Sequence, residues 1–266
     1  MHAHSGRVQI LKLTFLGTGT SIGVPAIGCD CGVCLSSDPF NKRRRAGLYV
    51  EAAGKNVVVD TPPEFREQAL AFKIKRLDAL LFTHGHVDHL AGFDDVRRFN
   101  QVQRERIPVY GSEATLADIS RMFPYIHQPE KPGLSYPRVD FNAVTGPFVI
   151  GDLGVVPVPV QHAGIPTFGY RFEAEGRAAA YIPDCRHIDD SSLALLAGLD
   201  ALILDTLRRR PHPTHFNLEQ SLEVLKKINA RRAYLTHICH ELDHRRTNSE
   251  LPSGISLAYD GLVVEL

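Results

Sequence analysis

Four side chains that can bind a metal ion, His84, His86, Asp88 and His89, lie within six residues. They follow the apolar run 77–82, which predicts a buried strand. In an extended chain His84 and His86 point the same way, so both can bind one ion, while Asp88 and His89 are offset toward a second direction. Neutral imidazole and carboxylate suit Zn²⁺, Mn²⁺ or Fe²⁺, and two such ions about 3.5–4 Å apart can activate water and hold a phosphodiester oxygen. A polar turn would explain any one of these residues, but four together predict a hydrolytic metal site.

A second group of potential ligands lies near the start of the chain, where Cys29, Cys31 and Cys34 fall within six residues. In a reduced compartment such thiols more often bind metal than form disulfides. Three thiolates and one further ligand would form a closed, tetrahedral structural zinc site. The residues leave three candidates for that fourth ligand: Cys185, Cys239 and His240.

Composition limits the class of protein and its partners. The 266 residues fit one α/β domain spanning 1–266, and 44% hydrophobic with 23% charged residues is typical of a globular domain. The net charge of zero argues against nucleic acid and favours a small-molecule substrate. No apolar stretch reaches the roughly 18–20 residues that span a bilayer, and residues 1–7 open no signal peptide, so we expect a cytoplasmic protein without membrane contact. Oligomeric state stays open, with a homodimer among the alternatives.

Short strands alternate with helices throughout, and the metal-binding candidates follow strand ends. Apolar runs bounded by turn residues predict strands at 8–16, 47–53, 55–60, 77–83, 154–161, 168–174, 178–182 and 200–204. Helices are expected at 63–73, 88–104 and, from one apolar face, 218–228. The segments 77–81 and 199–203 are weakly similar, which suggests two similar halves, each a sheet with helices outside.

The motif at residues 84–89 resembles the signature of the metallo-β-lactamase superfamily. The resemblance implies an α/β fold of the αββα type, with two mixed β-sheets, helices on the outer faces and a dinuclear metal site at the sheet edges. It implies that His162 completes the first metal site, Asp184 bridges the metals and His237 completes the second site. Asp60 would support a ligand without binding metal itself. Asp205, also at a strand end, is the alternative bridge.

The cysteine trio, the motif at 84–89 and the segments 212–218 and 235–240 together resemble the phosphoribosyl 1,2-cyclic phosphate phosphodiesterase family of the carbon–phosphorus lyase pathway. The likeness runs from about Leu13 to the C-terminus. It implies that His240 completes the structural zinc site, that Asp88 is both ligand and catalytic residue, and that His215 is a general acid or transition-state donor. His212 is the local alternative to His215.

The resemblance also implies a reaction. A hydroxide activated by two divalent ions, Mn²⁺ or Zn²⁺, would hydrolyse a small cyclic phosphodiester such as 5-phosphoribosyl 1,2-cyclic phosphate to ribose 1,5-bisphosphate. Such a substrate carries a second phosphate, which needs a basic or amide-rich pocket. Arg97, Arg98 and the arginines at 208–210 are candidates, although we prefer to interpret these runs as solvated faces.

Two other functions fit parts of the pattern. Related phosphodiesterases act on cyclic nucleotides or RNA 3′ ends, but the sequence contains no long basic arm insertion and does contain the cysteine trio. A noncatalytic binding protein of the pyrroloquinoline quinone biosynthesis type would share the cysteine zinc site. Such proteins depart from the histidine signature, whereas every ligand position is filled here, so catalysis is favoured.

Overall fold

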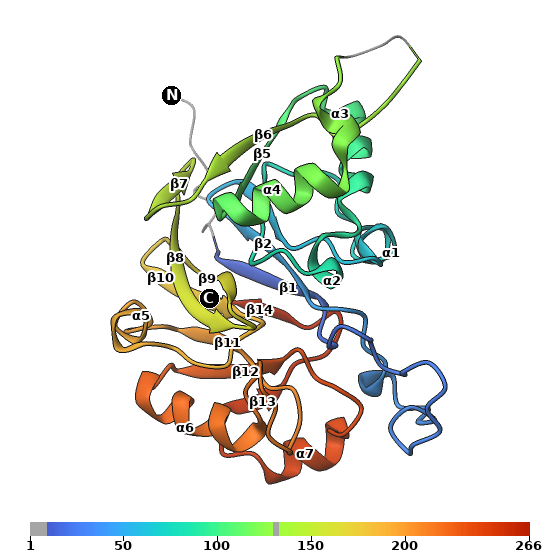
Figure 1. Ribbon diagram of the computed structural model, residues 1–266. Coiled ribbons are helices and arrows are strands. Elements are labelled where there is room, and N and C mark those ends of the chain that lie inside the picture. Colours follow the sequence, from blue (N-terminus) through green and yellow to red (C-terminus); the bar gives the residue numbers. More distant parts are fainter. Residues whose placement is uncertain (1–9, 130–132) are drawn as a thin grey trace, which may run out of the picture.

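Two β-sheets face each other in the computed structural model, which describes residues 10–129 and 133–266 (Figure 1). The first sheet has, in spatial order, β14 (Val263–Glu265), β1 (Lys12–Gly17), β2 (Gly47–Ala52), β3 (Lys55–Val59), β4 (Ala79–Leu81), β5 (Ile107–Gly111) and β6 (Val139–Ala143). The second has β13 (Ile255–Leu257), β12 (Arg232–Thr236), β11 (Ala201–Asp205), β10 (Arg177–Ile182), β9 (Ile165–Ala174), β8 (Leu153–His162) and β7 (Phe148–Ile150).

Helices cover the outer face of each sheet. Outside the first sheet lie α1 (Phe65–Ala71), α2 (Val87–Leu90), α3 (Val96–Gln103) and α4 (Glu113–Met122), and outside the second lie α5 (Asp190–Ala194), α6 (Leu218–Ile228) and α7 (His244–Glu250). Short 3₁₀ helices occur at η1 (Pro39–Asn41), η2 (Phe93–Asp95) and η3 (Pro124–His127). The predicted αββα sandwich with two mixed sheets is therefore confirmed. In the described residues no helix is both long and apolar enough to cross a bilayer.

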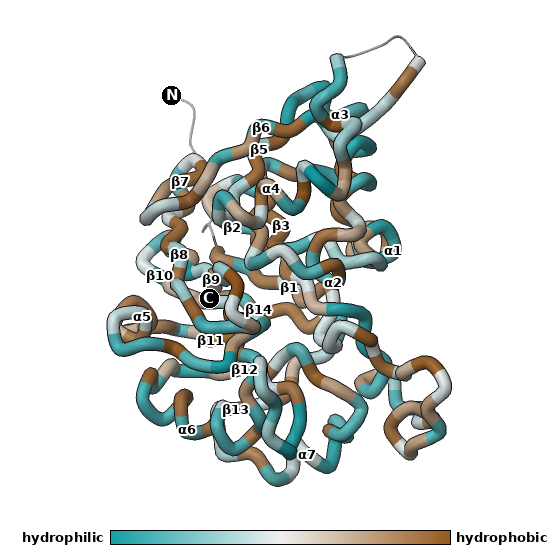
Figure 2. The backbone as a smooth tube through the Cα atoms, viewed as in Figure 1, coloured by the Kyte–Doolittle hydropathy of each residue, from teal (hydrophilic) through white to brown (hydrophobic). Residues whose placement is uncertain are grey.

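The alternation of side chains along the strands builds the layers. In β3, Val57 and Val59 enter the core between the sheets, while Val58 packs against the helices outside. In β11, Ile203 faces the inter-sheet core and Leu202 the opposite layer. Burying an aliphatic side chain of this size contributes roughly 1.5–3 kcal/mol, so two-sided burial strongly specifies the register of these strands. Figure 2 shows hydrophobic residues along β5, β6 and β1, whereas the outer helix α6 alternates hydrophobic and hydrophilic positions.

The sheets have matching topologies, which brings distant segments to one edge. Strands β1, β2 and β3 are antiparallel neighbours and β3 to β6 run parallel; likewise β8, β9 and β10 are antiparallel and β10 to β13 run parallel. The similar segments 77–81 and 199–203 overlap β4 and the start of β11, and these two strands occupy corresponding positions in their sheets. Because the carboxyl ends of parallel strands lie on the same side of a sheet, residues that follow β3, β4, β10 and β12 can converge.

Several boundaries differ from the sequence prediction. The helix expected at 88–104 is three pieces, α2, η2 and α3, with Gly92 at the break. The Gly92 N–H donates to the Thr61 carbonyl at 2.9 Å, and the Thr61 N–H donates to the His89 carbonyl at 2.8 Å, so tertiary contacts bend the chain there. The first strand begins at Lys12, and the first two residues of the range predicted for it, 8–9, lie outside the described residues.

Replacing Gly92 by alanine should destabilise the fold next to the metal-binding motif. An alanine Cβ would lie 2.2 Å from the Pro62 carbonyl oxygen and 2.7 Å from the Phe65 Cβ, so backbone must move. We expect Gly92→Ala to lower the free energy of unfolding by about 1–3 kcal/mol in a denaturant titration. Gly146→Ala, where a Cβ meets nothing within 4 Å, is the matched control and should change stability little. Equal stability of both variants would contradict the packing argument.

Candidate metal centre

Three histidines converge at the ends of β4 and β8. His84 Nε2 lies 2.9 Å from His86 Nδ1, which in turn lies 3.3 Å from His162 Nε2. His162 Nδ1 donates to the Thr214 carbonyl oxygen at 2.8 Å, so the His162 Nε2 atom carries the lone pair that faces the other two rings. Burial lowers the pKa of His162 to about 4, which keeps this imidazole neutral, the form that binds metal. The three nitrogen atoms could hold one cation.

A second group lies beside the first and contains Asp88, His89 and His237. His89 Nε2 lies 3.4 Å from an Asp88 carboxylate oxygen, and His237 Nε2 lies 3.9 Å from the same oxygen. Asp184, which follows β10, stands between the groups: its carboxylate is 3.2 Å from His89 Nε2, 3.4 Å from His237 Nε2 and 3.7 Å from His162 Nε2. Asp184 thus has the position expected of a bridging ligand.

The ring nitrogens and carboxylate oxygens of this centre suit cations, because their lone pairs face one another with no hydrogen atom between them. Asp60 accepts from His89 Nδ1 at 2.7 Å, which leaves the His89 Nε2 lone pair facing the Asp88 and Asp184 carboxylates. His89 Nε2, Asp184 Oδ2 and both His237 ring nitrogens are buried and have no hydrogen-bond partner among the residues that the structure describes. Unsatisfied buried lone pairs are costly, and divalent cations would satisfy them.

The charges of the buried carboxylates also favour a positive charge in the candidate metal centre. Burial opposes protonation of His89, but the carboxylates of Asp184, Asp60 and Asp88 outweigh burial and raise the pKa of His89 well above its usual value. Burial likewise opposes ionisation of Asp184, yet His237 and His89 hold its pKa well below the usual range. A bound cation could supply the charge that these residues otherwise obtain from a proton.

Two of the residues in the centre adopt a backbone conformation that non-glycine residues rarely take. Asp60 has φ 64° at the end of β3, and His237 has φ 58° at the end of β12. The loop after β1 helps to hold the second of these: the Ile238 N–H donates to the Thr18 carbonyl at 2.9 Å. Asp260 in turn accepts from the Thr18 N–H and hydroxyl, at 2.9 and 2.8 Å. Strain of this kind persists only where surrounding contacts enforce it, and it concentrates at functional sites.

Asp205, the alternative bridge, lies behind His215 instead of between the two ligand groups. Its Oδ2 atom accepts from His215 Nδ1 and from the Cys185 N–H, both at 2.8 Å, and its other oxygen is 4.0 Å from His237 Nδ1. The His215 ring stacks on that of His237, with centroids 4.7 Å apart and planes 15° apart. Sequence reasoning missed the Asp205–His215 pair, although the position of Asp205 at a strand end similar to that before His84 could have suggested it.

The cysteine trio meets His240 in space. His240 Nδ1 lies 3.1 Å from Cys29 Sγ and 3.5 Å from each of Cys31 Sγ and Cys34 Sγ, so the four atoms could surround one ion. The backbone N–H of Cys34 lowers the pKa of Cys31 to about 6, which favours the thiolate that binds zinc. Of the two other candidates, Cys185 Sγ instead contacts the His187 carbonyl oxygen and Cys239 Sγ accepts from the Glu241 N–H.

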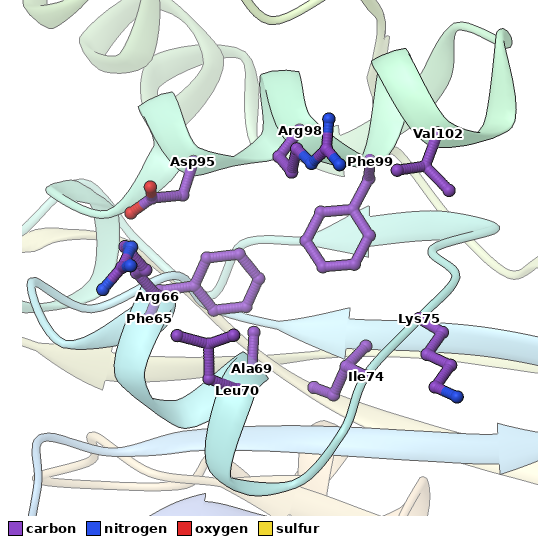
Figure 3. A pocket seen from close by; sticks show the side chains of 10 residues that line it. All are labelled: Phe65, Arg66, Ala69, Leu70, Ile74, Lys75, Asp95, Arg98, Phe99 and Val102. Atoms are coloured by element: carbon purple, nitrogen blue, oxygen red, sulfur yellow. The ribbon is translucent and has the colours of Figure 1, made fainter.

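The arginines singled out in the sequence have partners of their own. The ion pairs are Arg97–Asp94, Arg208–Glu241, Arg210–Glu241 and Arg209–Glu250. Arg98 lines a separate, mainly apolar cavity of about 530 Å³ between α1 and α3, beside Phe65 and Phe99 (Figure 3). None of these side chains lines the cavity beside His162, in agreement with a solvated face.

Metal analysis tests both groups of ligands. The protein purified without chelator should contain about three metal ions per chain, two for the histidine and aspartate centre and one for the cysteine cluster. Cys31→Ser should remove about one equivalent of zinc and lower the melting temperature, because structural zinc contributes folding energy directly.

Cys239→Ser is the matched control, since Cys239 is buried outside the cluster. It should retain the full metal content measured by plasma mass spectrometry. Loss of zinc from Cys239→Ser together with retention in His240→Ala would reassign the fourth ligand.

Comparison with known proteins places this geometry in a family. The beta-lactamase superfamily domain matches residues 55–238. A crystal structure described as a new diphosphatase from the PhnP family is 44% identical, with a TM-score of 0.89 and 97% of each chain covered. The octanoyltransferase of Porphyromonas gingivalis is 33% identical over 256 residues, which are 95% of this chain and 51% of that protein, so this chain spans about half the length of that relative. Coenzyme PQQ synthesis protein B of Methylobacterium radiotolerans is 25% identical over 224 residues, 73% of this chain and 72% of that one. The chain belongs to the metallo-β-lactamase superfamily and, within it, is similar to the PhnP family.

Proposed function

We propose that the chain is a metal-dependent phosphoric diester hydrolase that opens a small cyclic phosphodiester, such as 5-phosphoribosyl 1,2-cyclic phosphate, to give a phosphomonoester, here ribose 1,5-bisphosphate. The hydrolase class follows from membership of the superfamily and from 44% identity to a diphosphatase over nearly the whole chain. The observation that carries the proposal is the single buried focus of histidine and aspartate side chains from both sheets, with Asp184 within 4 Å of three ligand nitrogens.

The residues of this centre would have different roles. His84, His86 and His162 would hold one divalent ion, Asp88, His89 and His237 a second, and Asp184 both. Bound there, two such ions supply an activated water nucleophile and neutralise charge on the phosphate oxygens. Asp60 fixes the tautomer and orientation of His89 through its Nδ1 hydrogen bond, and the Thr214 carbonyl does the same for His162.

His215 is the proposed proton donor. Asp205 accepts from His215 Nδ1, so the ring is oriented and Nε2 is left to donate to a leaving oxygen or to a phosphate oxygen in the transition state. Burial lowers the pKa of His215. The carboxylates of Asp184 and Asp88 oppose this effect and favour the protonated ring. Burial raises the pKa of Asp205 well above its usual value, so the contribution of Asp205 is to orient the His215 ring. His212 lies at the same loop with its ring centroid 5.1 Å from that of His215, but no carboxylate pairs with it in the described residues.

A linear diphosphate is the second candidate substrate, because the 44% identical structure is described as a diphosphatase. A noncatalytic role like that considered for the quinone biosynthesis relatives is less well supported, since all ligand positions of the centre are filled and converge. Rates of hydrolysis of three substrates distinguish the cyclic phosphodiesterase, the diphosphatase and the noncatalytic binding protein. With added Mn²⁺, hydrolysis of 5-phosphoribosyl 1,2-cyclic phosphate should exceed that of a linear diphosphate and of bis(p-nitrophenyl) phosphate. Faster cleavage of either competitor would replace the specific substrate, and no cleavage of any would support a binding protein.

Removing His215 should separate proton donation from metal binding. We expect His215→Ala to lower kcat by about 10²–10⁴-fold, the usual contribution of a positioned general acid, with unchanged metal content. His212→Ala, which alters the neighbouring ring, is the control and should have a much smaller effect. Stopped-time product assays together with metal analysis of each variant provide the measurement. A full loss in His212→Ala with unchanged turnover in His215→Ala would reverse the two roles.

A further inference from the structure

A cavity of about 620 Å³ adjoins the metal centre, within the range of small-molecule sites. His162 forms part of its wall, and so does Thr214, whose carbonyl orients that histidine. Ala163 and Gly164, both with positive φ, make the two-residue turn between β8 and β9 along another side. The cavity therefore offers space for the part of a substrate that extends beyond a phosphate held at the metals.

Arg186 also lines this cavity, and its backbone is fixed beside the His162 strand. The Arg186 N–H donates to the Gln161 carbonyl at 2.7 Å, and the Gln161 N–H donates to the His187 carbonyl at 2.9 Å, an antiparallel bridge at the end of β8. Arg186 stands two residues after Asp184, so the candidate bridging ligand and this arginine belong to one rigidly connected segment.

The guanidinium of Arg186 has no carboxylate partner in the part of the chain that the structure describes, although the side chain is partly buried. Asp189, the nearby acid, is occupied by Gln161 and His187. The arginines near His212 are instead paired with Glu241 and Glu250. An arginine of intermediate exposure that lines a cavity beside the candidate metal centre and has no carboxylate partner among the described residues is suited to a fork-like contact with a ligand oxyanion.

We propose that Arg186 binds a second oxyanion group of the substrate, phosphoryl or carboxylate, remote from the phosphodiester that is cleaved. The inference rests on the proposed function for its location but assigns a new role: Arg186 selects small phosphodiesters that carry an additional negative group. Its contribution is to ground-state and transition-state binding alike, so it acts mainly on KM. Valine, isoleucine and proline side chains on the remaining walls give the uncharged part of the substrate an apolar surface.

Binding without chemistry tests this inference independently of the reaction. Metal-loaded protein is titrated calorimetrically with ribose 5-phosphate, with riburonate and with ribose, which differ in the group at one end. We expect the wild type to bind at least one anion about tenfold or more tightly than ribose, and Arg186→Met to abolish that preference. Arg186→Lys should retain part of it, because lysine keeps the charge and loses the fork. If binding of ribose 5-phosphate depends on Arg186, the recognised group is phosphoryl; if binding of riburonate does, the group is a carboxylate.

Arg66→Met is the matched control, since Arg66 lines the cavity between α1 and α3, away from the centre. It should bind all three ligands like the wild type. Metal content and the far-ultraviolet circular dichroism spectrum of Arg186→Met should match those of the wild type, showing an intact fold and metal centre. Anion binding that persists in Arg186→Met, or no anion preference in the wild type, would overturn the inference. Failure of cyclic phosphate hydrolysis alone would overturn the substrate assignment and leave the binding result to decide on Arg186.

Discussion

The candidate metal centre brings buried acceptor atoms of carboxylates and imidazoles face to face. Asp184 and Asp60 are almost entirely inaccessible to solvent, and the His89 ring lies between them with one nitrogen bonded and the other directed at carboxylates. Without positive charge such an arrangement is costly, because carboxylates and the unprotonated nitrogen of a neutral imidazole can only accept hydrogen bonds. The structure can therefore tolerate this centre only with protons or cations in it, which couples metal binding to the stability of both sheets.

The metal centre and the cysteine cluster share one short segment. His237 and His240 are three residues apart, and the Thr18 loop, which bonds to Ile238, leads directly to the cysteines. The bound zinc would fix the far end of this segment, and the contacts of Asp260 with Thr18 fix the loop that supports its near end. A structural metal at the edge of the fold would thus have a local effect: it would restrain His237, which is held in a strained backbone conformation.

Many charged side chains of this protein are balanced by opposite charges close by. The chain has no net charge, and Arg97 and the arginines at 208–210 form ion pairs with neighbouring aspartate and glutamate residues. On the proposals above, an anionic small molecule would be bound by a few groups in one place, the cations and Arg186, rather than by a broad positive surface. This distribution favours a compact phosphate ester over a long polyanion, whose binding scales with the number of neutralised phosphates.

The sequence by itself predicted the alternation of strands and helices and the ligand cluster at residues 84–89, because strand periodicity and ligand spacing are local properties of the chain, whereas the αββα architecture was predicted from the resemblance that this motif carries. His84, His86, Asp88 and His89 identify themselves by their spacing, and His162, Asp184 and His237 by resemblance and by position after apolar runs. Only the tertiary structure shows that Asp184 lies between the two ligand groups, that Asp205 pairs with His215, that the helix breaks at Gly92 and that Arg186 has no carboxylate partner among the described residues. Each depends on which strand ends lie side by side and which charges already have partners, and long-range packing sets both.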